Sequence, residues 1–283
     1  MGASGGTGVL YEEHVLLGAS LAESAVTGGP LVMGYAGEKN LDELLPDAVL
    51  SDLTGAAYLL VSGASSQALF SAAAAGRPLA VGEAAFEAVL TGEGRLLSVP
   101  LALRSGDHEH VLLDPTPRGA ALAAWLGFLS SMERDGYAPY ADASVEDASE
   151  MLVPLLLAGE RSRDVLSDYV RTAGEALPRE GEVRALHLDA IPALVAHVPG
   201  LGPEEWLLLV PAQRARVIWR SLLSFAEVSP VGARAARHLL ADRRPWASSL
   251  PAEGPVSVPR AELERWGVLR EGSDFVGARL LEP

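Results

Sequence analysis

The sequence predicts an α+β protein whose sheets are antiparallel. Short β-like runs separated by turn sequences alternate with stretches of helical periodicity. The 283 residues are 49% hydrophobic, which is enough to bury a large core. No internal repeat and no long low-complexity linker divides the chain, so we expect one large domain or two closely joined lobes.

The first expected unit opens with a helix. Residues 11–22 place apolar side chains at helical spacing, and Glu12 and Glu13 suit the positive end of a helix. Residues 48–61 then alternate around Gly55, and residues 65–75 return to helical spacing. This pattern predicts a strand that leads into a second helix.

An antiparallel meander and a further helix complete this unit. Good turn sequences at residues 91–94 and 105–107 separate three short β-like runs, at residues 87–90, 96–103 and 110–113. Residues 118–132 have helical periodicity, and Pro117 suits a helix start. We expect this helix to pack on the meander.

A second unit with the same mixture of elements follows. Its expected strands lie at residues 185–198 and 206–210, and its expected helices at residues 213–225 and 231–242. The tail, from residue 245 to residue 283, is rich in Pro and Gly.

The composition excludes several classes of protein. The chain has no Cys, which rules out disulfides, thiol nucleophiles and iron–sulphur ligation. A formal net charge of -15 without a basic stripe makes nucleic acid an unexpected partner. The most apolar stretches are shorter than the roughly 20 residues of a membrane helix, and residues 1–8 lack the features of a secretory signal. We therefore expect a soluble, cytoplasmic protein with no membrane partner.

Two motifs suggest a metal site and a catalytic serine, but the surrounding sequence supports neither. His108 and His110 lie on one face of a predicted strand, but zinc requires three or four ligands and the other histidines show no complementary spacing. We predict a solvated hairpin edge there and no metal. Residues 63–66 lack the Gly on both sides of a Ser that a nucleophile elbow requires.

Six short motifs follow one another along nearly the whole chain. They are Leu10-Tyr11-Glu12-Glu13-His14, Leu50-Ser51-Asp52-Leu53-Thr54-Gly55, the hairpin at 91–97 with its return strand at 107–113, residues 157–166, Gly232-Ala233-Arg234, and Asp274-Phe275-Val276-Gly277. In this order they resemble the folate-binding domain of the glycine-cleavage T-protein (aminomethyltransferase) family. The spacing of the hairpin and its return strand is the most similar feature.

The resemblance implies a T-protein-like folate-binding domain, built from two α+β lobes with antiparallel sheets around a central cavity. The first lobe would span residues 1–140, a second, ferredoxin-like lobe residues 141–245, and residues 246–283 would return to pack on the first lobe. The implied ligand is tetrahydrofolate. The family's C-terminal barrel has no counterpart here, so apolar surface at residues 274–281 would be exposed, or covered in a homodimer or by a partner protein.

Two carboxylates that the resemblance implies are missing. The family's turn carboxylate, which assists one-carbon transfer, falls at Ser98 and Val99, neither of which can act as a general base. The catalytic residue is therefore left unassigned. The family glutamate that pairs with the pterin ring falls at Leu207. Glu204 and Glu205 lie close by and would restore a carboxylate after a small shift of the alignment, or they are solvated turn residues.

Three further residues complete the expected ligand site with Ser98 and Glu204. Arg234 matches a family arginine, and it can hold a ligand carboxylate such as the folate glutamate or form a surface salt bridge. Asp52 ends a strand that would face the cavity, or it is an ordinary turn residue. Trp206 would border the pocket, although its apolar surroundings also fit a core position.

Two functions remain open on this basis. The first is a tetrahydrofolate-dependent one-carbon (aminomethyl or methyl) transferase, divergent at the catalytic carboxylate, in which positioning of the reactants supplies part of the rate. The second is a non-catalytic, folate- or metabolite-binding regulatory or assembly protein on the same fold. Ligand binding and turnover distinguish them, because a fold alone does not fix chemistry.

Overall fold

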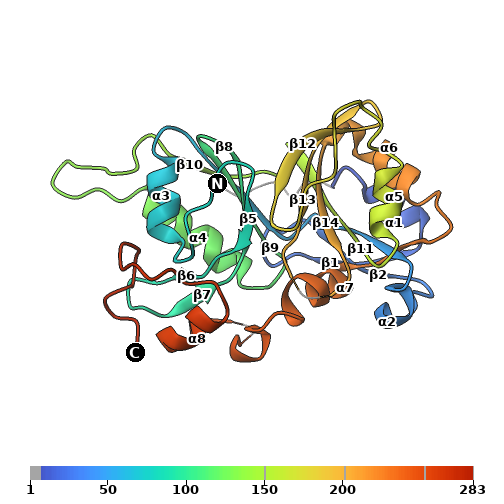
Figure 1. Ribbon diagram of the computed structural model, residues 1–283. Helices are drawn as coiled ribbons and strands as arrows, with labels where there is room; N and C mark the ends of the chain where they lie inside the picture. Colours follow the sequence, from blue (N-terminus) through green and yellow to red (C-terminus); the bar gives the residue numbers. More distant parts are fainter. Residues whose placement is uncertain (1–7, 150, 201, 252, 283) are drawn as a thin grey trace. The chain divides into compact units, whose positions relative to one another are not determined.

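The computed structural model describes residues 8–149, 151–200, 202–251 and 253–282 (Figure 1). The chain forms two compact units, each built from two separate stretches. Unit 1 contains the residues up to Gly55 together with Ser149–Asp242, and unit 2 contains Ala56–Ala148 together with the residues from Arg243 onward. Both units combine helices with mainly antiparallel sheets, which confirms the predicted α+β fold class.

These units divide the chain differently from the lobes expected at residues 1–140 and 141–245. The reason is strand pairing, because β3 (Ala48–Asp52) hydrogen-bonds to β11 (Leu152–Ala158) and to β15 (Val228–Pro230). Stretches on both sides of residues 56–148 thus share one sheet. Gly55, with a φ of +97°, adopts the left-handed conformation that glycine favours and turns the chain directly after β3.

A six-stranded sheet in the order β12–β13–β14–β11–β3–β15 forms the centre of unit 1. All neighbours are antiparallel except β15 and β3. The strands not yet bounded are β12 (Val183–Leu188), β13 (Ile191–His197) and β14 (Glu205–Pro211). The single strand predicted at 185–198 is in fact two strands, because Asp189, with a φ of +54°, turns the chain between β12 and β13.

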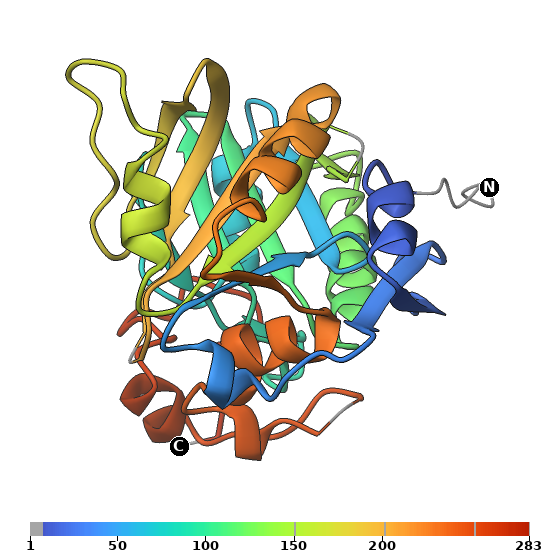
Figure 2. The same cartoon turned by 90° about the vertical axis from the view of Figure 1, so that its right-hand side faces the viewer.

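Short helices accompany this sheet (Figure 2). They are α1 (Tyr11–Leu16), α2 (Leu41–Leu44), α5 (Ser162–Ser167), α6 (Ala212–Leu222), α7 (Ala233–Arg237) and a π-helix, η1 (His238–Asp242). The apolar face of α6 packs with α5 on strands of the sheet through Ile218, Trp219, Val165 and Leu166. The two helices predicted at 213–225 and 231–242 are confirmed, the second as α7 followed by η1.

The opening helix is shorter than the periodicity predicts. It ends after Leu16, where Gly18 has a φ of +74°, and the chain continues as β1 (Ala19–Glu23). This strand pairs antiparallel with β2 (Pro30–Tyr35) to form a separate hairpin. The helix prediction for residues 17–22 is therefore wrong, because a left-handed glycine ends the helix within an apolar run.

Unit 2 contains a five-stranded antiparallel sheet with helices on one face. The strands, in sheet order, are β10 (Ser144–Asp147), β4 (Ala57–Ser62), β9 (Glu109–Asp114), β8 (Leu101–Gly106) and β5 (Ala84–Phe86). The helices are α3 (Ser66–Ala73) and α4 (Gly119–Ser130). Leu122, Leu126 and Leu129 of α4 join Leu69 and Phe70 of α3 in one core, which confirms the helix predicted at 118–132.

The rest of unit 2 is less regular. It contains β6 (Val89–Leu90), β7 (Leu96–Ser98), the 3₁₀-helix η2 (Ala247–Ser249) and α8 (Arg260–Arg265). The run predicted at 96–103 divides into β7 and β8, which lie in different sheets. Val256, from the tail, exchanges two backbone hydrogen bonds with Leu96. The tail is thus part of the same unit as residues 56–148.

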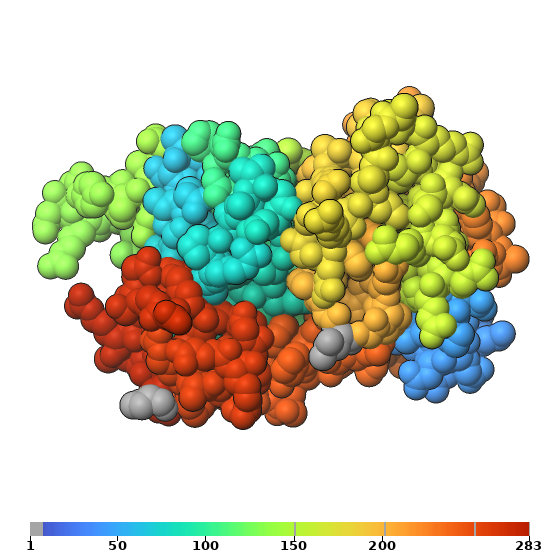
Figure 3. All heavy atoms as spheres, viewed as in Figure 1, coloured from blue at the N-terminus to red at the C-terminus, as the bar shows by residue number. Residues whose placement is uncertain are grey.

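One segment of unit 2 stands out from its surface. It follows α4 and is drawn in light green in Figures 1 and 3. Tyr137, in the segment after α4, is 71% exposed. Among the described residues, the structure contains no helix with the length and apolar character to span a membrane.

Candidate functional site

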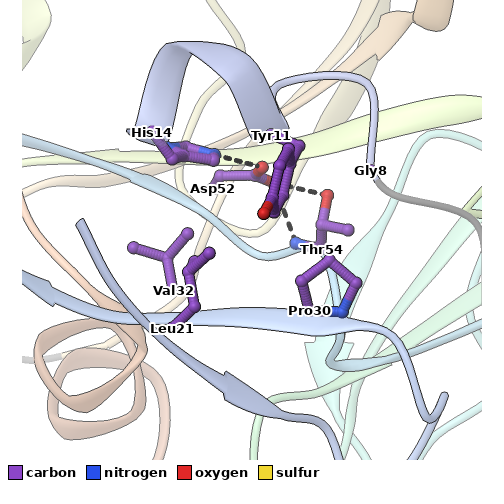
Figure 4. Close-up of a pocket in the computed structure, with 8 residues that line it drawn as sticks. All are labelled: Gly8, Tyr11, His14, Leu21, Pro30, Val32, Asp52 and Thr54. Atoms are coloured by element: carbon purple, nitrogen blue, oxygen red, sulfur yellow. Dashed lines mark hydrogen bonds and ion pairs between the residues drawn. The ribbon is translucent and has the colours of Figure 1, made fainter. Parts of the chain in front are cut away.

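A small pocket lies within unit 1, between α1, the β1–β2 hairpin and the end of β3 (Figure 4). Its volume is about 240 Å³ when its mouth, which is open to solvent, is included. It is lined by Gly8, Tyr11, His14, Leu21, Pro30, Val32, Asp52 and Thr54. Leu21, Pro30 and Val32 form an apolar wall, and Asp52 and His14 form the opposite, polar side. Most of this volume is open solvent, and the space inside that a water-sized sphere can occupy is about 10 Å³, which is room for about one water molecule.

The local fold explains why these side chains meet. Helix α1 is anchored by Leu10, which is fully buried in the core of unit 1, and this places Tyr11 and His14 on the pocket side. Asp52 is the last residue of β3, where a strand gives way to the Thr54-Gly55 turn. The side chain of an Asp at this position can accept hydrogen bonds from the turn that follows.

Asp52 is the most highly constrained group in the pocket. Its Oδ1 atom accepts hydrogen bonds from the Thr54 amide at 2.8 Å and from the Thr54 hydroxyl at 2.6 Å. Its Oδ2 atom lies 2.9 Å from Nε2 of His14. The carboxylate side chain is only 3% exposed, so these three donors fix its orientation.

His14 is held from both sides. Its Nδ1 atom lies 2.8 Å from the hydroxyl of Tyr35, and its ring meets Trp219 edge-on at a centroid distance of 5.0 Å. Burial raises the pKa of Tyr35, and the charges of Asp52 and Glu38 raise it further. The phenol therefore keeps its proton, and the tautomer of His14 sets which of the two groups donates. Because both ring nitrogens are engaged, His14 orients Asp52 and has no free nitrogen for a ligand.

The neighbouring carboxylate of α1 is paired in a different way. Glu13 accepts two hydrogen bonds of 2.7 Å from the Arg220 guanidinium, and Arg216 lies 3.2 Å away. The Arg220 hydrogen bonds lower the pKa of Glu13, together with the charges of both arginines, against the opposing effect of burial. This two-bond ion pair between Glu13 and Arg220 joins α1 to α6. Asp52 has no such cation: within the part of the chain that the structure describes, its ion-pair contact is to His14.

Ser98 lies in unit 2, at the end of β7, and it is buried. Its hydroxyl donates a short hydrogen bond to Asp114, which also accepts a 2.8 Å bond from the Thr116 amide. Burial raises the pKa of Asp114, and the hydrogen bonds from Ser98 and Thr116 oppose the rise. A carboxyl group therefore lies directly beside Ser98, at a position that the sequence reasoning did not consider.

Glu204 and Trp206 lie in one cluster of unit 1, at the start of β14. Glu204 is bound by Arg163, whose Nε lies 2.8 Å and 2.9 Å from its two carboxylate oxygens. The same guanidinium lies 4.9 Å from the centroid of the Trp206 ring, which stacks on His197 at 4.2 Å. The Trp206 indole is fully buried and donates to the Ser162 hydroxyl at 3.2 Å.

Arg234 is an exposed residue near the start of α7. Its guanidinium lies next to the α-carbon of Gly34 in β2, where the Glu38 carboxylate also approaches. Of the five residues expected to bind a cofactor, Glu204 and Trp206 are thus joined through Arg163. Asp52 belongs to the pocket, and Ser98 contacts Asp114. Their roles in binding remain predictions.

Sequence reasoning missed the partners of Asp52. The sequence places His14 in the opening motif and Thr54 in the turn after Asp52, and it gives no indication of Tyr35. The available signal was the pair of motifs that contain His14 and Asp52, since both were matched to the same family. Their side chains are 38 positions apart, and no short-range spacing connects them.

Comparison with solved structures identifies the fold. The chain is similar to glycine cleavage system aminomethyltransferase T from Bartonella henselae, with 22% sequence identity and a TM-score of 0.74, and the match covers 98% of this chain and 74% of that chain. A match to heterotetrameric sarcosine oxidase from Corynebacterium sp. U-96, in complex with pyrrole 2-carboxylate, has 18% identity and a TM-score of 0.47. It covers 77% of this chain and 93% of that chain. No protein-family model and no curated protein matches the sequence. The chain therefore has a T-protein-like fold, as its motif order predicts.

Proposed function

We propose that this protein is a tetrahydrofolate-dependent one-carbon (aminomethyl or methyl) transferase of the T-protein type. The observation that carries the proposal is the extent of the structural match, since 98% of the chain follows an aminomethyltransferase T. Folds host many functions, so the match supplies the class of reaction to test and the site must supply the chemistry.

The residues proposed to contact the cofactor are Asp52, Ser98, Glu204, Trp206 and Arg234. Asp52 supports the proposal most directly, because it is a fixed carboxylate in a pocket and can accept hydrogen bonds from a ligand. The exposed Arg234 guanidinium suits a carboxylate of the ligand. Glu204 is held by Arg163, and a ligand donor would have to replace that partner.

The burial and hydrogen bonding of Ser98 favour a second function. Its hydroxyl is buried and occupied by Asp114, so neither group is presented as a free base. This observation supports a non-catalytic protein that binds a folate or another metabolite in a regulatory or assembly role. Under that alternative the chain would bind ligand without turnover.

Calorimetry followed by a turnover assay tests the two functions in sequence. The transferase predicts saturable tetrahydrofolate binding, and formation of 5,10-methylene-tetrahydrofolate or 5-methyl-tetrahydrofolate from an aminomethyl or methyl donor. The alternative predicts binding without product. Arg234→Gln should weaken binding, whereas Arg237→Gln, which changes another exposed arginine of the same helix, should not. No binding at millimolar tetrahydrofolate would contradict both folate functions.

We also propose a cytoplasmic location, supported by the lack of Cys, and a homodimer or partner contact near residues 274–281. Leu280, in this segment, is 63% exposed. Leu280→Glu should then lower the molar mass measured by light scattering, whereas Val81→Glu, which alters an exposed apolar residue elsewhere in unit 2, should not. An unchanged mass in Leu280→Glu would contradict the homodimer.

A further inference from the structure

Strand β1 leaves one edge of its hairpin open. Within the described residues β1 pairs with β2 alone, and the two strands form a sheet of their own. Four of the five residues of β1 are exposed, and Figure 2 shows the strand, in dark blue, at the outside of unit 1. An open strand edge presents unpaired backbone N–H and C=O groups to other chains, so proteins usually protect it.

The features that protect a strand edge lie on β2. Pro30 begins this strand, and the register shift within the hairpin makes Met33 an extra residue on the β2 side. Gly232, just before α7, lies so close that a Cβ atom added to it would be 2.3 Å from the backbone carbonyl carbon of Met33. In contrast, β1 contains no Lys, no Pro and no extra residue, and its one charged residue is Glu23, at its end.

Alternate residues of β1 point their backbone groups away from β2. Gly18 and Ser24, on either side of the strand, hydrogen-bond to residues on the β2 side at 3.2 Å and 2.8 Å, so the even-numbered positions face β2. The N–H and C=O groups of Ala19, Leu21 and Glu23 therefore point to the open edge. None of these three residues makes another backbone hydrogen bond within the part of the chain that the structure describes.

We propose that β1 pairs with β1 of a second copy of this chain, antiparallel and across a two-fold axis at Leu21. The two Leu21 residues exchange both backbone hydrogen bonds, and Ala19 of each copy does the same with Glu23 of the other. The two hairpins thereby form one four-stranded sheet. This contact lies in unit 1, apart from the contact proposed near residues 274–281, and it does not depend on folate binding.

The symmetry and charge of this edge favour a second copy over an unlike partner. A two-fold contact requires a surface that is complementary to itself, and the outward groups of β1 are spaced evenly about Leu21. Because the net charge is -15, two copies can approach most easily where acidic groups are sparse. Residues 15–22 have no charged side chain, and in this register Glu23 lies opposite Ala19 instead of another carboxylate. Leu16, just before the strand, is 76% exposed and adds apolar surface that a second copy can cover.

Light scattering of the Leu280→Glu chain tests the contact, because this change is expected to remove the one near residues 274–281. The molar mass should rise with concentration toward that of two chains. Adding Leu21→Glu places two carboxylates opposite each other at the axis, and it should return the mass to that of one chain. Adding Val217→Glu instead, at an exposed apolar residue of α6 in the same unit, should leave the mass of two chains. The mass of one chain in Leu280→Glu at millimolar concentration, or that of two chains after Leu21→Glu, would overturn the proposal.

Disulfide cross-linking tests the register without relying on Leu21→Glu, and a chain without Cys gives no background. In the proposed pairing, Ser20 of one copy lies opposite Ala22 of the other at a Cα separation of about 4.5 Å, which a disulfide can span. The two Ser20 residues lie roughly 7–8 Å apart, which is too far. A mixture of Ser20→Cys and Ala22→Cys chains should therefore form cross-linked dimers on oxidation, whereas Ser20→Cys alone should not. Both positions are exposed, so both variants should fold. No cross-link in the mixture, or an equal amount in Ser20→Cys alone, would contradict the pairing.

Discussion

The imidazole of His14 lies 2.9 Å from the carboxylate of Asp52 and thereby joins the first helix of unit 1 to the end of β3. Both side chains are buried, and each has its other polar atoms bound, His14 by Tyr35 and Asp52 by Thr54. This pair fixes the polar side of the pocket. The contribution of this pair can therefore be measured as a change in the free energy of unfolding.

Removal of His14 should destabilise unit 1. In His14→Ala the Asp52 carboxylate loses a hydrogen-bond donor while it stays buried, and an unsatisfied buried acceptor costs about 1–3 kcal/mol, or more when it is charged. Tyr35→Phe is the matched control, because it removes only the hydroxyl bond to Nδ1, at about 1 kcal/mol. Urea unfolding measures both. Equal losses in the two variants would show that the His14–Asp52 contact contributes little.

Insertion of a carboxylate at position 98 should not restore a free base. In Ser98→Asp the new group lies against Asp114, and two carboxylates at this distance cannot both be ionised when buried. We expect a loss of stability of several kcal/mol at pH 7 that becomes smaller as the pH falls. Ser98→Ala, which removes one donor to Asp114, should cost about 1–3 kcal/mol. Thermal unfolding at pH 5 and pH 7 separates these outcomes. Full wild-type stability in Ser98→Asp would contradict the buried Ser98–Asp114 contact.

Glu87 should make unit 2 less stable as the pH rises. Burial raises its pKa from 4.5 to about 8, and the Gly76 amide and the charges of Arg77 and Arg270 oppose the rise only in part. The folded state therefore binds more protons than the unfolded state between these two values, and stability falls across that window. At about 1.4 kcal/mol per pKa unit the effect is a few kcal/mol. Glu87→Gln imitates the protonated group, so the variant should become more stable than the wild type as the pH rises from 5 to 8. Parallel pH profiles of the two proteins would contradict this expectation.

His110 should make unit 2 less stable as the pH falls, which is the opposite of the pH dependence expected from Glu87. Burial lowers its pKa from 6.5 to about 4, with a smaller effect from Arg104, and its ring stacks on Phe70 at 4.2 Å. Because the unfolded state binds the extra proton, stability is present above pH 6.5 and is lost as the pH falls toward 4. Neither ring nitrogen has a hydrogen-bond partner among the described residues. His110→Leu should therefore match or exceed wild-type stability at pH 7 and lose less of it at pH 5, as measured by urea unfolding. A large loss at pH 7 would indicate that the imidazole makes an essential polar contact.

The sequence predicts much of the fold and little of the site. The helix at 118–132 follows from Pro117 and the apolar spacing of Leu122, Trp125, Leu126 and Leu129, of which the three leucines are buried and Trp125 is partly buried. The end of α1 could not be predicted in this way, because a Gly18 with positive φ stops a helix inside an apolar run. The division of the run at 96–103 into β7 and β8 depends on which strand each half pairs with, β6 for β7 and β5 for β8, in two different sheets. Tertiary context determines those features, and local propensity does not.

The same limit explains why the network around the pocket was not anticipated. Asp52 was singled out from its place at a strand end, but its partners His14 and Tyr35 come from a helix and a separate hairpin. Asp114 is likewise 16 positions from Ser98, and the two residues lie at the ends of different strands, β9 and β7. Buried polar contacts of this range have no local sequence signature, because any Asp at a strand end has the same local pattern.

The pairing of Glu204 with Arg163 gives a direct test of the proposed cofactor contacts. If Glu204 binds tetrahydrofolate, the ligand must displace the Arg163 guanidinium, which makes a half-exposed ion pair. Such pairs contribute about 0–1 kcal/mol, so Arg163→Gln should raise tetrahydrofolate affinity by up to roughly fivefold in calorimetry. Arg171→Gln breaks the exposed pair with Asp189 and serves as the charge-matched control, with unchanged affinity expected. An affinity that is unchanged or lower in Arg163→Gln would remove Glu204 from the cofactor contacts, because a released carboxylate that took part in binding could only have become more available to the ligand.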